Sequence, residues 1–231
     1  MTDRSTLQLV IEASTTVGSV ALIRGGAVLD VRQVTMGSGA ADVLFPAMVS
    51  LCEEADVTPS ALARIVCGEG PGSFTSLRIA AALAKGVAHG GGVPLAAVSS
   101  LLMAGASTLQ TLPTGRYAVH ADALRGERYV QWMEVRTSDV MALGPAQRMS
   151  VAQLQALTTE ANRLGVLSAP AELTGAVVTP NALGFLRIAP AAIVDVPVAT
   201  WEPLYGRLAE AQVQWEQRHG EPLPVVPLVS I

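Results

Sequence analysis

Residues 68–78 read GEGPGSFTSLR, a glycine-rich stretch that joins a short apolar run to a segment with helical spacing. The run before it, ARIVCG at 63–68, predicts a buried strand, and residues 75–88 predict a helix whose alanines and glycines let neighbouring backbone approach closely. Glycines let the loop turn with its N–H groups exposed, and unpaired amides at a helix start favour anions. A plain strand-to-helix turn and an anion site therefore both explain the loop. It is neither a P-loop nor a dinucleotide loop, because Ser73 stands where both patterns need glycine.

The segments on both sides of this loop predict an α/β fold. Three apolar runs near the N-terminus are separated by short turns, as in an antiparallel meander, and the period then changes to a helical one. A meander followed by alternating strands and helices is typical of an α/β lobe with a mixed sheet. The elements predicted in this half are strands at 7–13, 18–24, 27–34, 63–68 and 93–98 and helices at 42–55, 75–88 and 99–109.

The break at residues 113–115, Pro-Thr-Gly, predicts a boundary between an N-terminal α/β lobe, 1–112, and a C-terminal α/β lobe, 113–231. Strands at 116–121 and 127–135 surround the turn DALRG, and this hairpin resembles the one at 7–24. Glu12 and Asp122 are the corresponding acids at the strand ends. The repeat indicates either a duplicated fold or two hairpins that are alike by chance. Beyond it we predict helices at 151–164 and 182–189, a strand at 191–196 and an extended Pro-rich segment at 220–231.

The composition describes a globular chain with no broad electrostatic attraction for nucleic acid. Of 231 residues, 50% are hydrophobic and 15% charged, which excludes a disordered chain. The net charge is -4, Lys85 is the only lysine, and no run of basic residues occurs. We expect Cys52 and Cys67 to be reduced, buried and inert. The N-terminus does not resemble a secretory signal, so we expect a cytoplasmic protein without membrane segments.

The polar residues offer few candidates for chemistry. The three histidines, His89, His120 and His219, lack the spacing that places two imidazoles on one helical face, so we predict no metal site. A second-lobe turn carries Asp122, Arg125 and Glu127, which could serve acid–base catalysis. At a turn between strands, however, such residues more often bond turn amides and one another, and we favour this structural role.

Several stretches, taken in order, resemble the TsaB (YeaZ) family, an accessory subunit used by bacteria in making threonylcarbamoyladenosine on tRNA. They are LVIEAST at 9–15, LFPAM at 44–48, GPGSFTSLRIAAALAKGVA at 70–88, VPLAAVSSLLMAGA at 93–106, DALRGERY at 122–129 and WEPLYGR at 201–207. The family signature falls on Gly70, Pro71, Gly72, Ser73, Phe74, Thr75 and Arg78, with Ser73 interpreted as a helix cap. The resemblance implies a two-lobe actin-like, sugar-kinase-like fold, in which each lobe is a mixed sheet flanked by helices.

The resemblance also implies a function and partners. It indicates a non-catalytic subunit that organises a TsaD-like transferase, which forms N6-threonylcarbamoyladenosine at position 37 of tRNA. It implies a homodimer when the chain is alone, a TsaE-like ATPase as a further partner, and tRNA contact only through the complex. No cofactor is expected on this chain alone, and the resemblance leaves open a nucleotide at or near the partner interface.

Three positions depart from the family pattern. Glu12 stands where the family usually has Asp, Ser76 where it usually has Gly, and Ala40 where it usually has His. The first departure weakens the alternative function, a stand-alone actin-like-fold ATPase or small-molecule kinase that would use Glu12, Asp122 and the loop at 70–73. A third alternative is a structural protein that only self-associates.

The helix at 43–55 carries two apolar stripes, which predict a docking surface. One stripe is Leu44, Met48, Leu51 and Ala55, and the other is Phe45, Val49 and Cys52. A lobe core needs only one of them, so the other would leave an exposed apolar patch of a kind that soluble monomers seldom carry. The opposing interpretation buries both stripes. The interface residues predicted here, on helices that the resemblance also implies, are Leu44, Phe45, Met48, Ala80, Ala81, Ala84 and Lys85.

Overall fold

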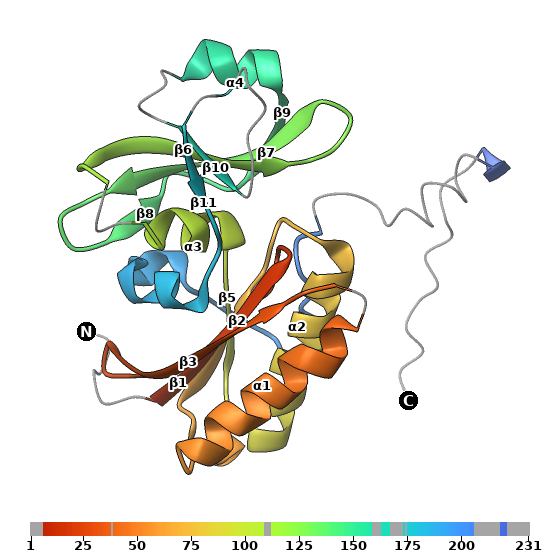
Figure 1. Ribbon diagram of the computed structural model, residues 1–231, viewed down its shortest axis with the longest axis vertical. Coiled ribbons are helices and arrows are strands. Elements are labelled where there is room, and N and C mark those ends of the chain that lie inside the picture. The colour runs from red at the N-terminus through yellow and green to blue at the C-terminus, as the bar shows by residue number, and fades with distance from the viewer. Residues whose placement is uncertain are drawn as a thin grey trace.

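The computed structural model describes residues 7–37, 39–108, 112–158, 163–166, 173, 175–205 and 218–220, and it contains two mixed sheets, one in each lobe (Figure 1). The first sheet has the strand order β12-β5-β4-β1-β2-β3. Its central strand β1 is buried along its whole length, because helices cover both faces of the sheet. Its strands are β1 (Leu7–Glu12), β2 (Val17–Arg24), β3 (Ala27–Thr35), β4 (Arg64–Gly68), β5 (Leu95–Val98) and β12 (Val194–Val196).

The second sheet repeats the plan of the first. Its order is β11-β10-β6-β7-β8, with β9 also paired to β7. In each sheet an antiparallel hairpin, β1–β2 or β6–β7, is followed by a strand parallel to its first member, β4 or β10. The predicted two-lobe α/β architecture is confirmed, and the two hairpins occupy equivalent places in separate sheets. The strands are β6 (Gly115–Asp122), β7 (Glu127–Val135), β8 (Val140–Ala142), β9 (Gln147–Ser150), β10 (Arg163–Val166) and β11 (Ala176–Val178).

Helices form layers around and between the sheets (Figure 1). Helices α1 and α2 cover the outer face of the first sheet, and α4 covers the outer face of the second. Helix α3 and the 3-10 helix η3 lie between the sheets, where one hydrophobic core contains residues of both lobes. The helices are α1 (Ala40–Glu54), α2 (Phe74–Gly91), α3 (Ser100–Ala106), α4 (Val151–Leu157) and the 3-10 helices η1 (Pro59–Ala61), η3 (Ala182–Arg187) and η4 (Pro190–Ala192).

The second half differs from the predicted elements in several places. The helix predicted at 151–164 ends at Leu157, and Arg163 instead begins β10, because pairing with β6 gives this short apolar run an extended partner. The helix predicted at 182–189 is the 3-10 helix η3, and the strand predicted at 191–196 shortens to β12. The sequence did not predict β8, β9 or β11. Residues 109 and 221–231, the ends of two predicted segments, lie outside the described residues.

The chain returns to the first lobe near its end. Strand β12 lies within the range 113–231 that the sequence assigns to the second lobe, yet it pairs with β5 of the first sheet. Trp201, which follows it, packs into the core beneath α1 and α2. The first lobe is therefore completed by residues far along the chain.

Candidate functional site

The turns of the two equivalent hairpins meet at a pocket of about 340 Å³ between the lobes. The first turn contributes Ser14–Thr16 and the second contributes Ala121–Leu124. Pro71, Gly72 and Ser73 form a third wall. These last residues belong to the glycine loop, the segment Gly68–Ser73 between β4 and α2. The predicted loop and both acid-ended hairpins thus come together in one place.

Glu12, at the end of β1, lies beneath this pocket and does not line it. Its side chain is 0% exposed. One carboxylate oxygen, Oε1, accepts a hydrogen bond from the backbone N–H of Ser14 at 2.7 Å, and Oε2 accepts one from the hydroxyl of Ser100 at 2.8 Å. Burial raises the pKa of the Glu12 carboxyl, and the bonds from Ser14 and Ser100 act against this rise. Both oxygens of this carboxyl group are therefore bonded within the protein interior.

The glycine loop is packed against the first hairpin turn. Ser73 donates its backbone N–H to the carbonyl of Ser14 at 2.8 Å. A Cβ atom on Gly72 would lie 2.2 Å from that carbonyl oxygen, so only glycine permits this approach. Ser73 caps α2, because its side chain accepts the Ser76 N–H at 3.5 Å. The hydroxyl of Ser76 also donates to that of Ser73 at 3.1 Å, which gives a structural use to one departure from the family pattern.

Residues 204 and 205 hold the other side of the loop. Leu204 donates its N–H to the carbonyl of Glu69 at 2.7 Å, and the ring of Tyr205 packs on Phe74 with centroids 4.6 Å apart. The guanidinium of Arg78 also lies over the Phe74 ring, 5.3 Å from its centroid. Thr75 is exposed at the start of α2. The family stretch at 201–205 therefore serves to hold the start of α2.

The second-lobe turn is organised by local bonds. Asp122 Oδ1 accepts the Leu124 N–H at 3.1 Å and faces Arg128 at 3.5 Å, while Glu127 pairs with Arg148 at 3.1 Å. Neither acid bonds Arg125 in this structure. Leu124 and Arg125 have positive φ angles, which the tight turn requires. Asp122 thus bonds a turn amide as expected, but the three residues do not form one cluster.

A buried polar group that was not predicted from the sequence lies on the outer face of the second sheet. His120 Nδ1 accepts a hydrogen bond from Arg128 Nε at 3.2 Å. Burial, together with the charges of Arg128 and Arg163, lowers the pKa of His120 to about 4. Alternating polar residues in β6 and β7 could have suggested a polar face here. Within the described ranges, no three His, Cys, Asp or Glu side chains are grouped so as to hold a metal ion.

The predicted interface residues divide into core and surface. Five of the seven face the sheet or a neighbouring helix and are buried, so the prediction that they form a surface is wrong for them; they are Leu44, Met48, Ala80, Ala81 and Ala84. The helical period explains this result, because the stripe of Leu44 and Met48 is the one that α1 turns toward the sheet, where it packs on β2 and β3. Lys85 is also engaged, since it donates to the carbonyl of Trp201 at 2.8 Å and pairs with Glu202 at 3.3 Å.

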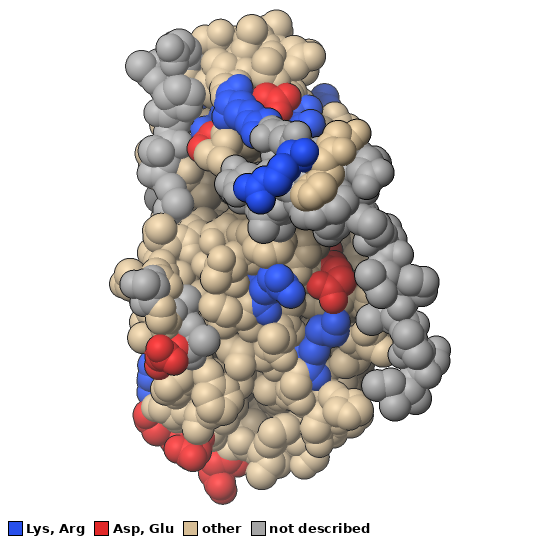
Figure 2. All heavy atoms as spheres, turned by 90° about the vertical axis from the view of Figure 1, so that its right-hand side faces the viewer, with Lys and Arg blue, Asp and Glu red and all other residues tan. Residues whose placement is uncertain are grey.

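The second stripe of α1 reaches the surface and lines an apolar groove of about 260 Å³. Phe45 is 50% exposed, and Val49 and Cys52 are half-buried beside it. Val87 closes the groove from α2. We call this region, with its lining from α1 and α2, the α1–α2 groove. Figure 2 shows that the lobe containing these helices presents a mostly uncharged surface, with acidic side chains gathered along its lower edge.

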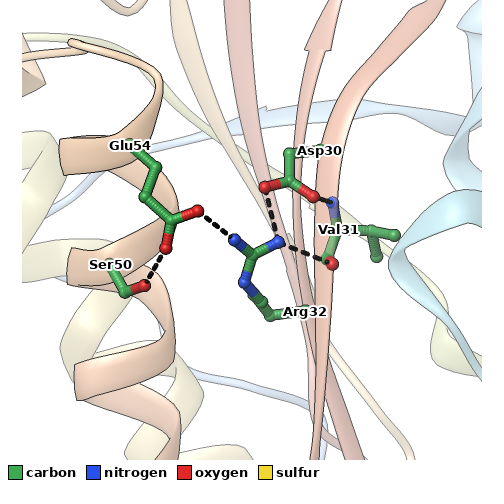
Figure 3. A network of polar contacts seen from close by, with 5 residues as sticks. All are labelled: Asp30, Val31, Arg32, Ser50 and Glu54. Atoms are coloured by element: carbon green, nitrogen blue, oxygen red, sulfur yellow. Dashed lines mark hydrogen bonds and ion pairs between the residues drawn. The ribbon is translucent and has the colours of Figure 1, made fainter.

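Polar contacts hold α1 in place on the edge strand β3. Arg32 on β3 lies between Asp30 of the same strand and Glu54 of α1 (Figure 3). Its Nη2 donates to Glu54 Oε2 at 2.6 Å, and Ser50 donates to the other Glu54 oxygen at 2.6 Å. This network connects the last turn of α1 to β3.

The chain is similar to proteins of known family. A family model described as TsaD, tRNA N6-adenosine threonylcarbamoyltransferase, matches residues 40–175, which is more than half of the chain. Two curated relatives are named tRNA threonylcarbamoyladenosine biosynthesis protein TsaB. The one from Bacillus subtilis is 29% identical over 155 residues, 67% of each chain, and the one from Haemophilus influenzae is 25% identical over 238 residues, 92% of this chain and 97% of the relative. The chain belongs to the TsaB (YeaZ) family.

Solved structures from the TsaB (YeaZ) family share this fold. A Pseudomonas aeruginosa protein described as similar to peptidase YEAZ has a TM-score of 0.73 at 25% identity, with 87% of this chain and all of that chain covered. YeaZ from the same organism has a TM-score of 0.71 at 24% identity, covering 87% and 99% of the two chains. The actin-like two-lobe fold implied by the resemblance is confirmed. Of the helices in the described part of the chain, none is long and apolar enough to cross a membrane.

Proposed function

We propose that this chain is a non-catalytic partner subunit of a TsaD-like transferase that forms N6-threonylcarbamoyladenosine at position 37 of tRNA. Membership of the TsaB (YeaZ) family, whose curated relatives are named for this biosynthesis, supports involvement in the same modification. The observation that carries the docking role is the α1–α2 groove with its half-exposed Phe45.

The groove has the character of a protein-binding surface. Its lining is apolar apart from Glu53, and Phe45 in this lining is 50% exposed. Exposed apolar patches of this kind mark interaction sites, and buried aromatic side chains often carry much of the binding energy. The transferase subunit would cover this surface, and a second copy would cover it when the chain is alone. Contact with tRNA and with a TsaE-like ATPase would then occur through the assembled complex.

The interlobe pocket gives weaker support to the alternative, a stand-alone ATPase or kinase. Both hairpin turns and the glycine loop meet there, as such an enzyme would need. However, the carboxylate of Glu12 is bonded inside the protein, and the lining residues in the described part of the chain include neither Lys nor Arg to balance phosphate charge. We therefore propose no cofactor for the chain alone, and place any nucleotide at or near the partner interface.

The test replaces Phe45, whose side chain reaches the surface, with Glu. We expect Phe45→Glu to weaken binding to the purified transferase subunit by at least about 30-fold, because a charge in an apolar interface is costly. Val43→Glu is the matched control, since Val43 is 40% exposed on the same helix and does not line the groove. Binding is measured by calorimetry, and modified tRNA by mass spectrometry after reconstitution.

Both variants must keep the wild-type circular dichroism spectrum and melting temperature. Met48→Glu is not a usable test, because Met48 is only 4% exposed and the charge would enter the core. If Phe45→Glu binds the transferase subunit as tightly as Val43→Glu, the groove is not the docking surface. Measurable ATP hydrolysis by the isolated chain, lost in Asp122→Asn, would favour the enzyme alternative.

A further inference from the structure

Glu12 belongs to a closed circuit of hydrogen bonds around the glycine loop. Its two oxygens accept from the Ser14 N–H and from the Ser100 hydroxyl. The same Ser100 hydroxyl accepts the Gly70 N–H at 3.0 Å, and the Ser100 N–H donates to the Gly70 carbonyl at 3.0 Å. The Ser73 N–H returns to the Ser14 carbonyl and closes the circuit. One buried carboxylate thereby connects the first hairpin turn, the loop and the start of α3.

The space for this carboxylate is provided by a missing side chain. Gly68, the last residue of β4, lies directly against Glu12, and a Cβ atom there would lie 1.8 Å from Glu12 Oε2 and 2.8 Å from its Cδ. It would also lie 2.9 Å from the Ser100 hydroxyl oxygen. Gly68 has no positive φ angle, so an alanine would be excluded by lack of space and not by backbone conformation. The closest of these contacts is with Glu12, so the length of residue 12 is the main reason why glycine is needed at position 68.

We propose that Glu12 is a positioning residue that holds the glycine loop in shape, and that its length is matched to the absence of a side chain at Gly68. The carboxylate acts through Ser100 on Gly70, and the loop then presents Pro71, Gly72 and Ser73 to the interlobe pocket. Aspartate at position 12 would withdraw the carboxylate by roughly one carbon–carbon bond, about 1.5 Å. This would remove the two contacts of a position-68 Cβ atom with Glu12. The remaining contact, with the Ser100 hydroxyl oxygen at 2.9 Å, would be relieved by rotation of that hydroxyl group, which the loss of its bond to Glu12 permits. This inference concerns the isolated chain and does not depend on the proposed docking function.

The first experiment tests the matching of the two positions by melting temperature. Gly68→Ala should lower the Tm by about 4–10 °C, because forcing a methyl group into a packed site is costly. Glu12→Asp alone should also lower the Tm, since it loses the Ser100 bond. In the double variant, Gly68→Ala with Glu12→Asp, the Tm should exceed that of Gly68→Ala alone, whereas losses at independent positions would add.

A matched control separates the effect of side-chain length at position 12 from the effect of its charge. Glu12→Gln keeps the length of the side chain and removes its charge, so Gly68→Ala combined with Glu12→Gln should show no recovery. Recovery in both double variants, or in neither, would overturn the matching. If Gly68→Ala does not fold, folding of the double variant with Glu12→Asp supports the matching, and its failure to fold contradicts it.

The second experiment tests positioning of the loop by amide hydrogen exchange. Ser100→Ala removes the acceptor of the Gly70 N–H, and that amide should exchange about 5- to 10-fold faster, as expected for one lost hydrogen bond. Glu12→Ala should have the same effect at Gly70 although it does not contact that amide. Ser19→Ala is the control, because it removes a buried 2.8 Å bond to the Ala182 N–H and should leave Gly70 exchange unchanged. Wild-type exchange at Gly70 in Glu12→Ala would overturn the positioning role.

Discussion

Glu12 and Asp122 occupy equivalent places in the two sheets, each at the end of the first strand of a hairpin, but their surroundings are opposite. The Glu12 side chain is 0% exposed and bonded to Ser14 and Ser100, whereas that of Asp122 is 60% exposed and faces Arg128. Equivalent positions in a repeated backbone arrangement therefore do not give their side chains the same structural role. In the first lobe the acid organises a buried loop, and in the second it stabilises a surface turn.

The largest difference between the lobes should appear when each acid is truncated. Glu12→Ala leaves a cavity and two buried donors without an acceptor, so we expect a loss of roughly 2–4 kcal/mol in the free energy of unfolding. Asp122→Ala loses one turn bond and an exposed pair, and we expect a loss of at most about 1 kcal/mol. Urea denaturation of both variants measures this contrast. Equal losses in the free energy of unfolding would show that the two acids contribute equally to stability, against this prediction.

A pH titration of stability should sharpen the contrast, because the buried titratable group of the second lobe is a base. The folded-state pKa of His120 is lowered to about 4, so His120 favours the folded state above pH 6.5, and this contribution is lost as the pH falls toward 4. The loss should amount to about 3 kcal/mol relative to His120→Gln, which does not titrate. The raised pKa of Glu12 has the opposite sign, since it lowers stability as the pH rises above 4.5. A constant difference between wild type and His120→Gln from pH 7 to 4 would contradict the buried, neutral imidazole.

The smallest effect is expected from surface ion pairs, for which the two lobes should be alike. Glu54→Gln in the first lobe removes the pair with Arg32, and Glu127→Gln in the second removes the pair with Arg148. Each should lower the Tm by no more than about 2 °C, and 1 M NaCl should reduce the difference, because water and salt screen exposed charges. Differential scanning calorimetry resolves shifts of this size. A much larger shift for Glu54→Gln would mean that the position of α1 depends on this network.

Sequence patterns predicted the first lobe more completely than the second. The helix containing Ala80 and Ala84 and the hairpins on either side of the loop have long, regular patterns, and their predicted ranges lie close to the observed ones. Strands β8, β9, β10 and β11, which were not predicted, are three or four residues long, too short to show a period. Pairing with strands elsewhere in the chain makes them strands, as for Arg163 in β10, which pairs with Ala118 in β6. Local sequence carries little information about such partners.

The sequence by itself determined the family, the two acid-ended hairpins, the glycine loop and the existence of two apolar stripes on α1, because each depends on residue types at short spacings. Only the tertiary structure decided that Leu44 and Met48 face the core while Phe45 faces the groove. It also decided that Lys85 is held by Trp201 and that Glu12 lies under Gly68. These outcomes depend on which atoms are brought together across long separations in the chain. Close packing allows one arrangement there and excludes its alternatives, and no local pattern records that choice.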